Sequence, residues 1–448
     1  MLGRRTFYVS DTPAADDAND GRTPRTAWRS IARVNAASPR AGDTILFHGG
    51  GEFRGNLVLG PRSAGTPRRP VTIGSFGAGR ATILAGAGTA VLVRDAGGVR
   101  VRNLVVRGDG PRANRGSGIA FENRLSGDVR LAHVRIEDVD ATGFGRFGVR
   151  VGGRRGKSGY ADVRITGVVA HGNRDGGIEV HGTFSQTANG YANAGVYIAR
   201  CDAHDNPGYA RSRRHVGDGI VVSDVDGAVI ELCRAWANGA LCTYRDGPVG
   251  IWAWDANAVV IRLCVSRGNR AAGPADGGGF DLDGGVTNSV IERCVSHDND
   301  GAGFGVYQFR YARPMRGNAI RDNLSVNDGR RNGYGGITLM NLGSGVRDID
   351  VSGNVVYVDR PAAAGRGNLP PAVRIKSGTE GVRVRRNLLV VGGGGPVVRT
   401  RGPQAGLAFH GNSCRATGSE GPRFQASLRS FGCESAWLEA ARRGGSNS

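Results

Sequence analysis

Short apolar runs alternate with clusters of Gly, Asn and Asp along most of the chain, and this pattern returns about every 30 residues. One column of the repeat consists of asparagines separated by 33, 32, 31, 30 and 28 residues: Asn173, Asn206, Asn238, Asn269, Asn299 and Asn327. A second column holds cysteines separated by 32, 31 and 30 residues and continues as asparagines: Cys201, Cys233, Cys264, Cys294, then Asn323, Asn354 and Asn387. Two columns whose spacing drifts together indicate a real structural repeat.

The length and composition of the repeat predict a parallel β-helix. Helical repeats need amphipathic stretches of about ten or more residues without Gly, and residues 90–400 lack them. Propeller blades need about 40 residues or more. Coils of short parallel strands, stacked at ~4.8 Å, let Asn amides link one coil to the next while Cys thiols pack inside. We therefore expect an all-β fold, a single right-handed parallel β-helix (solenoid).

The ends of the chain depart from the repeat and are expected to act as caps. The predicted division is an N-terminal cap segment over residues 1–50, coils over residues 51–401, and a C-terminal cap or tail over residues 402–448, in one structural domain. Thr26 to Ala37 places Trp28, Ile31 and Val34 on one helical face, which suits a plug over the first coil. Residues from 402 onward look irregular, with a short helix near Ala436 to Arg442.

The net charge of +20 favours an anionic partner. A nucleic acid is not expected, because the sequence has no basic helix and no aromatic-studded RNP-like strand. No stretch of 18 or more apolar residues occurs, so no membrane span is expected. The first residues run into a predicted strand without an apolar signal region, so a secretory signal is absent from this chain, either removed or never present.

Several landmarks resemble known β-helix enzymes. Residues 8–50 contain Tyr8-Val9-Ser10, Asn19-Asp20-Gly21, Trp28, and Gly42-Asp43 before an apolar strand, and this run is similar to the opening of extracellular enzymes of the pectate lyase superfamily. The segment GGGFDLDGGVTNSVIERCVSHDNDGAGF is similar to repeats of carbohydrate-active β-helix proteins. The resemblance covers roughly residues 8–400 and implies a secreted or periplasmic protein. That superfamily includes lyases, hydrolases, epimerases and non-catalytic spikes, so fold does not decide the chemistry.

One strand of each coil follows a Gly-rich entry, and its side chains alternate between the core and the outside. The residues expected to point inward are the pairs Ile119/Phe121, Val149/Val151, Ile178/Val180, Ile220/Val222, Ile251/Ala253, Phe280/Leu282, Phe304/Val306, Ile337/Leu339 and Val373/Ile375. The first outward column is then Ala120, Arg150, Glu179, Val221, Trp252, Asp281, Gly305, Thr338 and Arg374. The second is Glu122, Gly152, His181, Ser223, Trp254, Asp283, Tyr307, Met340 and Lys376.

Asp281 and Asp283 are the candidate catalytic residues in these columns. They lie two apart on one strand, so their Cβ atoms are roughly 6.5–7 Å apart, which permits the separation of about 6.5–9.5 Å between the carboxyls of inverting glycosidases. Outward Trp252, Trp254 and Tyr307 flank them and suit stacking against sugar rings. The aspartates can alternatively hold calcium or substrate hydroxyls.

The remaining candidates for substrate binding are Glu179, His181, Arg374 and Lys376. Glu179 lies three coils from Asp281 in this register, so a distal subsite or plain surface suits it. Arg374-Ile375-Lys376 resembles the Arg-Ile-Lys triplet of polygalacturonases, which holds a substrate carboxylate. The Asn-Thr-Asp, Asp-Asp and Gly-His-Gly elements of that family have no match here. No zinc site is expected, because His-x-x-x-His and paired Cys-x-x-Cys spacings are missing, and no residue is assigned as a metal ligand.

These features favour a polysaccharide-cleaving enzyme, a glycoside hydrolase acting on an anionic, uronate-containing glycan in a groove along residues 178–376. The alternatives are a lyase, with Lys376 or Arg374 as base and calcium held by the acidic side chains, and a non-catalytic carbohydrate-binding β-helix. Hydrolysis would require no cofactor, whereas a lyase would use calcium. The oligomeric state stays open. If the aspartates are not catalytic, the loops at 206–216 and 308–316 are the next candidates.

Overall fold

The computed structural model describes residues 4–274, 276–343, 345–359, 369–376, 378–418, 421–427, 429–432 and 434–443. The fold is an all-β parallel β-solenoid of about 12 turns with few helices. Its residues divide into two compact units, unit 1 (Met1–Pro207 and Ser223–Ala228) and unit 2 (Gly208–Val222 and Val229–Ser448). The predicted parallel β-helix is confirmed, while its right-handed sense stays a prediction.

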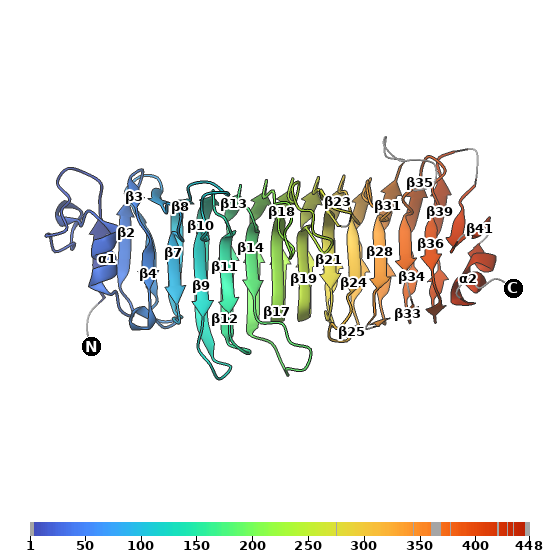
Figure 1. The fold of residues 1–448 in the computed structure, drawn as a ribbon, viewed down its shortest axis with the longest axis horizontal. Helices are drawn as coiled ribbons and strands as arrows, with labels where there is room; N and C mark the ends of the chain where they lie inside the picture. The colour runs from blue at the N-terminus through green and yellow to red at the C-terminus, as the bar shows by residue number, and fades with distance from the viewer. Residues whose placement is uncertain are drawn as a thin grey trace. The chain divides into compact units, whose positions relative to one another are not determined.

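Unit 1 consists of three stacks of parallel strands (Figure 1). The first stack is β1 (Thr6–Val9), β2 (Thr44–His48), β5 (Val71–Phe76), β8 (Val99–Arg107), β10 (Arg130–Thr142), β12 (Gly159–Thr166) and β15 (Asn193–Ala199). The second is β3 (Glu52–Arg54), β6 (Ala81–Leu84), the later halves of β8 and β10, β13 (Val169–His171) and β16 (Asp202–His204). The third is β4 (Leu57–Leu59), β7 (Val91–Arg94), β9 (Ile119–Asn123), β11 (Phe147–Gly153) and β14 (Gly176–His181).

Unit 2 repeats this arrangement of parallel stacks. One stack is β17 (Asp218–Glu231, part of which belongs to unit 1), β19 (Val249–Arg262), β21 (Gly278–Asp283), β24 (Phe304–Gln308), β28 (Ile337–Asn341), β32 (Val373–Lys376), β36 (Val398–Arg401) and β40 (Phe424–Ala426). The next is β22 (Val290–Glu292), β26 (Ala319–Arg321), β30 (Asp350–Ser352), β34 (Arg383–Arg385) and β38 (Ala408–His410). The third is β18 (Arg234–Trp236), β20 (Val265–Arg267), β23 (Val295–His297), β27 (Leu324–Val326), β31 (Val355–Val358), β35 (Leu388–Val391) and β39 (Ser413–Ala416). The short strands β25 (Met315–Arg316), β29 (Val346–Arg347), β33 (Thr379–Glu380) and β37 (Gln404–Ala405) form a small separate sheet.

The apolar core follows the predicted strand parity. All the residues expected to point inward, from Ile119/Phe121 to Val373/Ile375, are 1% exposed or less. Like positions also pair in register, for example Ile251 with Phe280 and Phe280 with Phe304. The rings of Phe280 and Phe304 are stacked with centroids 5.2 Å apart. The alternation of apolar and polar residues therefore sets both the core and the register.

Buried asparagines link successive coils through hydrogen bonds. In unit 2 the side-chain amides of Asn238 and Asn269 donate to the Oδ1 atoms of Asn269 and Asn299 at 3.0 and 2.9 Å. The column does not continue at Asn327, as the sequence pattern predicted, because Asn299 donates to Oδ1 of Asp328 at 2.8 Å. Asn327 instead has a positive φ of 54° at the turn. A carboxylate thus replaces the next amide of the column.

The second column is confirmed. The backbone amides of Cys233 and Cys264 contact the Sγ atoms of Cys264 and Cys294 at 3.4 and 3.5 Å. The backbone amide of Cys294 then donates to Oδ1 of Asn323 at 2.9 Å, and further asparagines continue the column. These buried thiols and amides satisfy polar groups of the coil core, as the repeat predicted.

Helix α1 (Ile31–Ala37) is shorter than the predicted segment Thr26 to Ala37, whereas α2 (Glu434–Arg443) spans the helix predicted near Ala436 to Arg442. Helix α1 begins only at Ile31, because the Ser30 side chain caps it by accepting from the backbone amide of Arg33, and two 3-10 turns lie at Pro24–Thr26 and Pro61–Ser63. Trp28 precedes the helix but is buried, as are Ile31 and Val34. Within the described residues, neither helix is long and apolar enough to cross a membrane.

The C-terminal segment is more regular than predicted. Parallel coils continue past residue 402 through β38, β39 and β40, and β40 then pairs with the antiparallel strand β41 (Arg429–Phe431). Helix α2 packs Trp437 against Phe409 and Phe424. Parallel coil strands therefore extend beyond residue 402, and the boundary of the C-terminal cap stays a prediction.

The asparagine column of unit 2 yields a test of what holds the coils in register. Asn299→Ala removes the acceptor used by both the backbone and the side-chain amide of Asn269. We expect a loss of about 1–3 kcal/mol for each buried group left without a partner. Chemical denaturation of the purified protein measures it. Asn189→Ala, at an exposed turn position, is the matched control and should change stability by less than about 0.5 kcal/mol. Equal stability of the two variants would contradict the role of the asparagine column in holding the coils together.

Candidate active site

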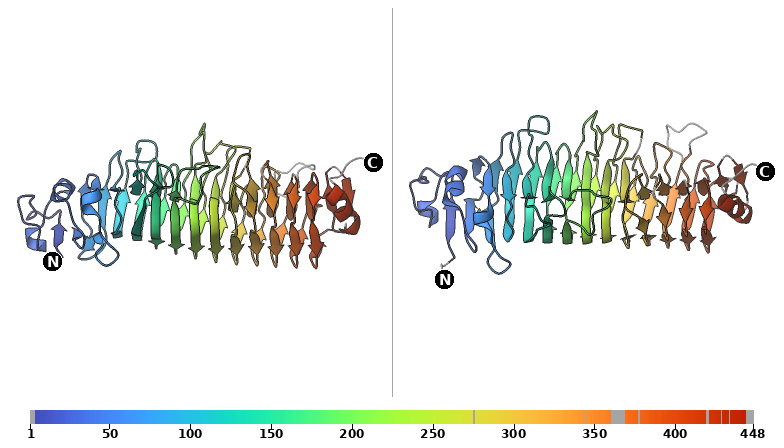
Figure 2. Two further views of the ribbon diagram at one scale, coloured as in Figure 1. Left: turned by 90° about the horizontal axis from the view of Figure 1, so that it is seen from below. Right: turned by 60° about the horizontal axis from the view of Figure 1, so that its bottom comes forward.

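The predicted outward columns of unit 2 form as expected on neighbouring strands β19, β21, β24 and β28 (Figure 1). Trp252 and Trp254 lie beside Asp281 and Asp283 in register. On the next coil, Asp281 is followed by Gly305 and Asp283 by Tyr307. Figure 2 shows the same strands, coloured yellow-green to orange, side by side from two further directions. The two aspartates are thus central in a row of aligned outward positions.

These outward side chains are covered rather than open to solvent. The exposed fractions of Trp252, Asp281 and Tyr307 are 4%, 2% and 8%. Asp283 and Trp254 are partly exposed. The expectation of an open groove with exposed tryptophans is therefore wrong for Trp252. Loops between the strands pack over the columns. The position of these loops could not be predicted from the sequence repeat, because the loop residues follow no period.

One covering loop brings a histidine–aspartate pair to the tryptophans. The ring of His215 meets the rings of Trp252 and Trp254 edge-on, with centroids 4.9 and 6.3 Å apart. Its Nδ1 lies 2.8 Å from Oδ2 of Asp218, which is completely buried. The carboxylate orients the imidazole of His215. His215 belongs to the 206–216 loop that sequence analysis held in reserve.

Two further loops bring Asp276 and Tyr334 together. The hydroxyl of Tyr334 donates to Oδ1 of Asp276 at 3.3 Å, and the backbone amide of Gly247 donates to its Oδ2. Tyr334 itself packs beside Tyr307, with ring centroids 6.0 Å apart. The guanidinium of Arg374 lies 5.9 Å from the Tyr334 ring centroid. This contact network places a third carboxyl, Asp276, near the predicted pair.

Burial raises the pKa values of all three carboxyls, and the charges of neighbouring acidic residues raise them further. Burial raises the pKa of Asp276 to about 7, against hydrogen bonds from Gly247 and Tyr334 that lower it. Burial also raises the pKa of Asp283 to about 7. The pKa of Asp281 is raised well above its usual range by burial and by the charges of Asp283 and Asp276. Carboxyls in such proximity do not all ionise together, so at neutral pH the cluster holds at least one proton.

Two buried polar atoms in this cluster have no hydrogen-bond partner among the described residues. They are Oδ1 of Asp281 and Nε1 of Trp252. An unsatisfied buried polar group costs about 1–3 kcal/mol. Unsatisfied groups beside carboxyls with raised pKa values are typical of sites that bind a polar ligand. An acceptor–donor pair of this kind suits the hydroxyl groups of a sugar.

The predicted site residues Glu179 and His181 lie in unit 1, apart from the unit that holds the aspartates. Glu179 forms an ion pair with Arg150 of the preceding coil. His181 is 8% exposed, and burial lowers its pKa to about 4. A neutral histidine and a neutralised carboxylate fit packing in unit 1. Their role in binding substrate stays a prediction.

Arg374 and Lys376 lie on β32, two register steps beyond Gly305 and Tyr307. Arg374 donates to the carbonyl oxygen of Gly333 at 2.6 Å, beside Tyr334. Burial and the neighbouring Arg374 and Arg401 lower the pKa of Lys376. As for metals, no group of three or more His, Cys, Asp or Glu side chains in the described residues is arranged to hold an ion. Calcium binding stays an untested alternative.

Sequence reasoning missed Asp276, His215, Asp218 and Tyr334. Asp276 stands directly before the Gly-rich entry of β21, and Asp218 is the first residue of β17. The same Asp-Gly pair occurs at ordinary turns, for example Asp300-Gly301. The sequence pattern alone therefore did not distinguish a site aspartate from a turn aspartate. Their position is set by loop conformation, which has no sequence period.

The sequence matches no protein-family model. A lacto-N-biosidase from Bifidobacterium longum subsp. longum is 35% identical over 74 residues, which are 16% of this chain and 5% of that relative's length. The GH136 lacto-N-biosidase structure from Eubacterium ramulus has a TM-score of 0.61 and 17% identity, covering 92% of this chain and 68% of that one. The mannuronan C-5 epimerase A-module from Azotobacter vinelandii has a TM-score of 0.48 and 15% identity, covering 94% and 100%. The resemblance to carbohydrate-active β-helix proteins is thus confirmed at the level of the fold.

The raised pKa values predict a pH dependence for any reaction that uses the carboxyl cluster. A carboxyl acting as an acid must carry its proton, and it loses that proton as the pH rises through its pKa. Because the pKa values of Asp276 and Asp283 are about 7, the rate should fall above about pH 7. The measurement is kcat/KM against pH. A profile that stays flat from pH 5 to about pH 9 would contradict an acid role.

Proposed function

We propose that this protein is a glycoside hydrolase whose acid and base are drawn from Asp276, Asp281 and Asp283. The observation that carries the proposal is the clustering of three carboxyls with raised pKa values beside buried aromatic rings. Glycosidic cleavage needs one protonated and one ionised carboxyl at the same bond. Partial protonation of the cluster provides both states at neutral pH.

Strand geometry limits which of the carboxyls can act as acid and which as base. Asp281 and Asp283 are separated by one residue of β21, roughly 6.5–7 Å between Cβ atoms. This spacing suits an inverting arrangement, in which one carboxyl protonates the leaving oxygen and the other activates a water. Asp276 stands at the entry of the same strand, held by Tyr334, and raises the pKa of both. It acts either as the acid itself or as the group that keeps a neighbour protonated.

The aromatic side chains would hold the sugar. Trp254, which is partly exposed, and Tyr307 lie on either side of Asp283 in register. Trp252 is covered by His215, so it supports the site through its orphaned Nε1 rather than through an open ring face. Sugar rings stack on aromatic faces, and their hydroxyls satisfy buried polar atoms.

The likeness to lacto-N-biosidases supports a glycan substrate and hydrolysis. The net charge of +20 supports an anionic, uronate-containing glycan, met outside the cytoplasm in secreted or periplasmic form. Both the substrate and the location are part of the proposal, since the matched stretch is only 5% of the curated relative.

A lyase is the second candidate, and the lowered pKa of Lys376 favours it. Burial and neighbouring arginines make the amine of Lys376 easier to deprotonate, and a neutral amine can remove a proton from a uronate. In that reaction the acidic cluster would hold calcium against the substrate carboxylate. Chelator then inhibits, and the product contains an unsaturated uronate. The hydrolase is preferred because the carboxyl cluster has the two protonation states that hydrolysis uses.

Substitution of the carboxyls tests the proposal. Asp276→Asn, Asp281→Asn and Asp283→Asn should each lower kcat by about 10²–10⁴-fold, since each removes an acid–base group or its electrostatic partner. The fold should survive, because none of the three points into the coil core. Asp298→Asn, at a turn of the same unit and 46% exposed, is the matched control and should keep full activity. Near-normal activity in all three site variants would refute the site. Restoration by excess calcium would favour the lyase.

A further inference from the structure

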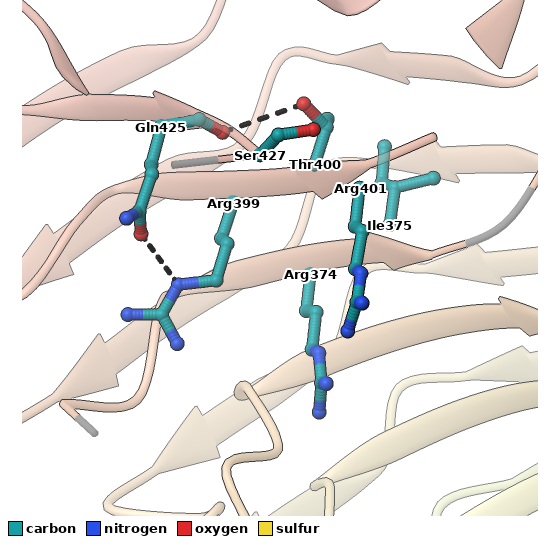
Figure 3. Close-up of a pocket in the computed structure, with 7 residues that line it drawn as sticks. All are labelled: Arg374, Ile375, Arg399, Thr400, Arg401, Gln425 and Ser427. Carbon is teal, nitrogen blue, oxygen red and sulfur yellow. Dashed lines mark hydrogen bonds between the residues drawn. The ribbon is translucent and has the colours of Figure 1, made fainter. Parts of the chain in front are cut away.

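Three arginines and one lysine extend from adjacent strands at the later end of the outward columns. Arg374 is in register with Arg399, and Lys376 with Arg401. Neighbouring strands are about 4.8 Å apart, so the four cations form a compact group. The three arginines border a cavity of about 520 Å³, whose lining also includes Thr400, Gln425 and Ser427. Figure 3 shows the three guanidinium groups on one side of the strands.

No carboxylate of the described residues pairs with these four cations. The arginines instead donate to neutral groups: Arg399 donates to Oε1 of Gln425 at 2.6 Å and to the carbonyl of Leu369 at 3.0 Å, as Arg374 does to the carbonyl of Gly333. Several other arginines of unit 2 have acidic partners, for example Arg385 with Asp350 at 2.7 Å. The pocket therefore concentrates positive charge that the chain itself leaves uncompensated.

The charges in the group repel one another. Burial lowers the pKa of Arg399, and Arg374 lowers it further. Burial together with Arg374 and Arg401 lowers the pKa of Lys376. A bound anion would relieve this repulsion, because guanidinium groups bind carboxylates and sulfates through paired hydrogen bonds.

Arg374 connects this pocket to the carboxyl cluster. It holds the loop carrying Tyr334, and Tyr334 donates to Asp276. Along the first outward column, Arg374 follows Asp281 by three coils, through Gly305 and Thr338. That separation is about 14 Å at the strand spacing, a distance that a short oligosaccharide spans.

We infer that the arginine pocket is a subsite for one anionic group, a carboxylate or a sulfate, of the glycan that the carboxyl cluster cleaves. The inference rests on the proposed function and adds to it the position and chemistry of the charged group. The anion lies among Arg374, Arg399 and Arg401, while the scissile bond lies at Asp281 and Asp283. The amide of Gln425 and the hydroxyl of Ser427 offer neutral donors at the rim.

Binding without cleavage tests the subsite. Isothermal titration calorimetry of the full chain should use trigalacturonate, its methyl ester as the neutral match, and a sulfated carrageenan tetrasaccharide. The parent should bind at least one acidic probe more than tenfold more tightly than the methyl ester. The probe that binds identifies the group as carboxylate or sulfate. No preference for either acidic probe would overturn the inference.

Variants locate the effect in the pocket. Arg401→Gln and Arg399→Gln should each lower the affinity for the acidic probe by at least about tenfold. This is the loss expected for one charge-assisted hydrogen bond. Among the described residues the side chain of Arg401 makes no hydrogen bond, and its backbone carbonyl accepts one from Gln404. Loss of the Arg401 side chain should therefore leave the fold intact even if Arg399→Gln disturbs it. Arg415→Gln, an equal charge change at an exposed position of β39, is the control. Equal weakening in Arg415→Gln, or normal binding in Arg401→Gln, contradicts the subsite.

The outcome is separable from that of the proposed function. Calorimetry needs no catalysis, so anion binding is measurable even if the Asp variants prove the carboxyl cluster inert. Inactive Asp variants combined with unaltered binding in Arg401→Gln would sink the subsite alone.

Discussion

Parallel stacking at about 4.8 Å is the constraint on which the rest of this structure depends. Each side chain lies directly beside the one at the same position of the next coil. A column of like residues is therefore stable only if their side chains pack together or form hydrogen bonds at that spacing. Apolar residues do so readily, as the stacked rings of Phe280 and Phe304 illustrate. Asparagines do so because each amide both donates and accepts, which lets Asn238, Asn269 and Asn299 form a continuous chain of hydrogen bonds.

Like charges stacked on neighbouring strands repel one another, which costs free energy. Unit 2 nevertheless gathers like charges at two places along one row of strands. Around Asp281 and Asp283 the chain gathers carboxyls, and at Arg374 and Arg399 it gathers cations. Elsewhere it interleaves opposite charges between coils, as with Arg262 and Glu231. Both exceptions lie under or beside irregular loops that add Asp276, His215 and Tyr334. If the proposed function holds, a glycan with one acidic group would engage both clusters.

The register, the inward core and both outward columns were predictable from the sequence because they follow a period of two within strands and about 30 between coils. The pairing of Trp252 with Asp281 and of Trp254 with Asp283 is a direct consequence of that period. The burial of Trp252 was not predictable. It depends on the conformation of the loop carrying His215, whose residues show no repeat. Asp276 was missed for the same reason, since its Asp-Gly sequence also occurs at turns without a site.

A smaller error shows where periodicity itself becomes unreliable. The Asn column was expected at Asn327, but Asp328 occupies the position, one residue later. Either residue supplies an acceptor, and the coil length decides which one reaches Asn299. Burial then raises the pKa of Asp328 to about 6. A carboxyl can thus serve as a plain link in the fold, so a raised pKa alone does not mark a site; the three carboxyls near Tyr334 differ because they face one another.

The most direct test is to incubate the protein with a panel of neutral, uronate-containing and sulfated glycans and to measure reducing ends together with ultraviolet absorbance. The panel should include substrates of lacto-N-biosidases and run with and without chelator. Hydrolysis by the carboxyl cluster predicts new reducing ends with no rise in absorbance and no effect of chelator. Absorbance that rises with the reducing ends, and that chelator abolishes, would contradict hydrolysis and establish elimination in its place.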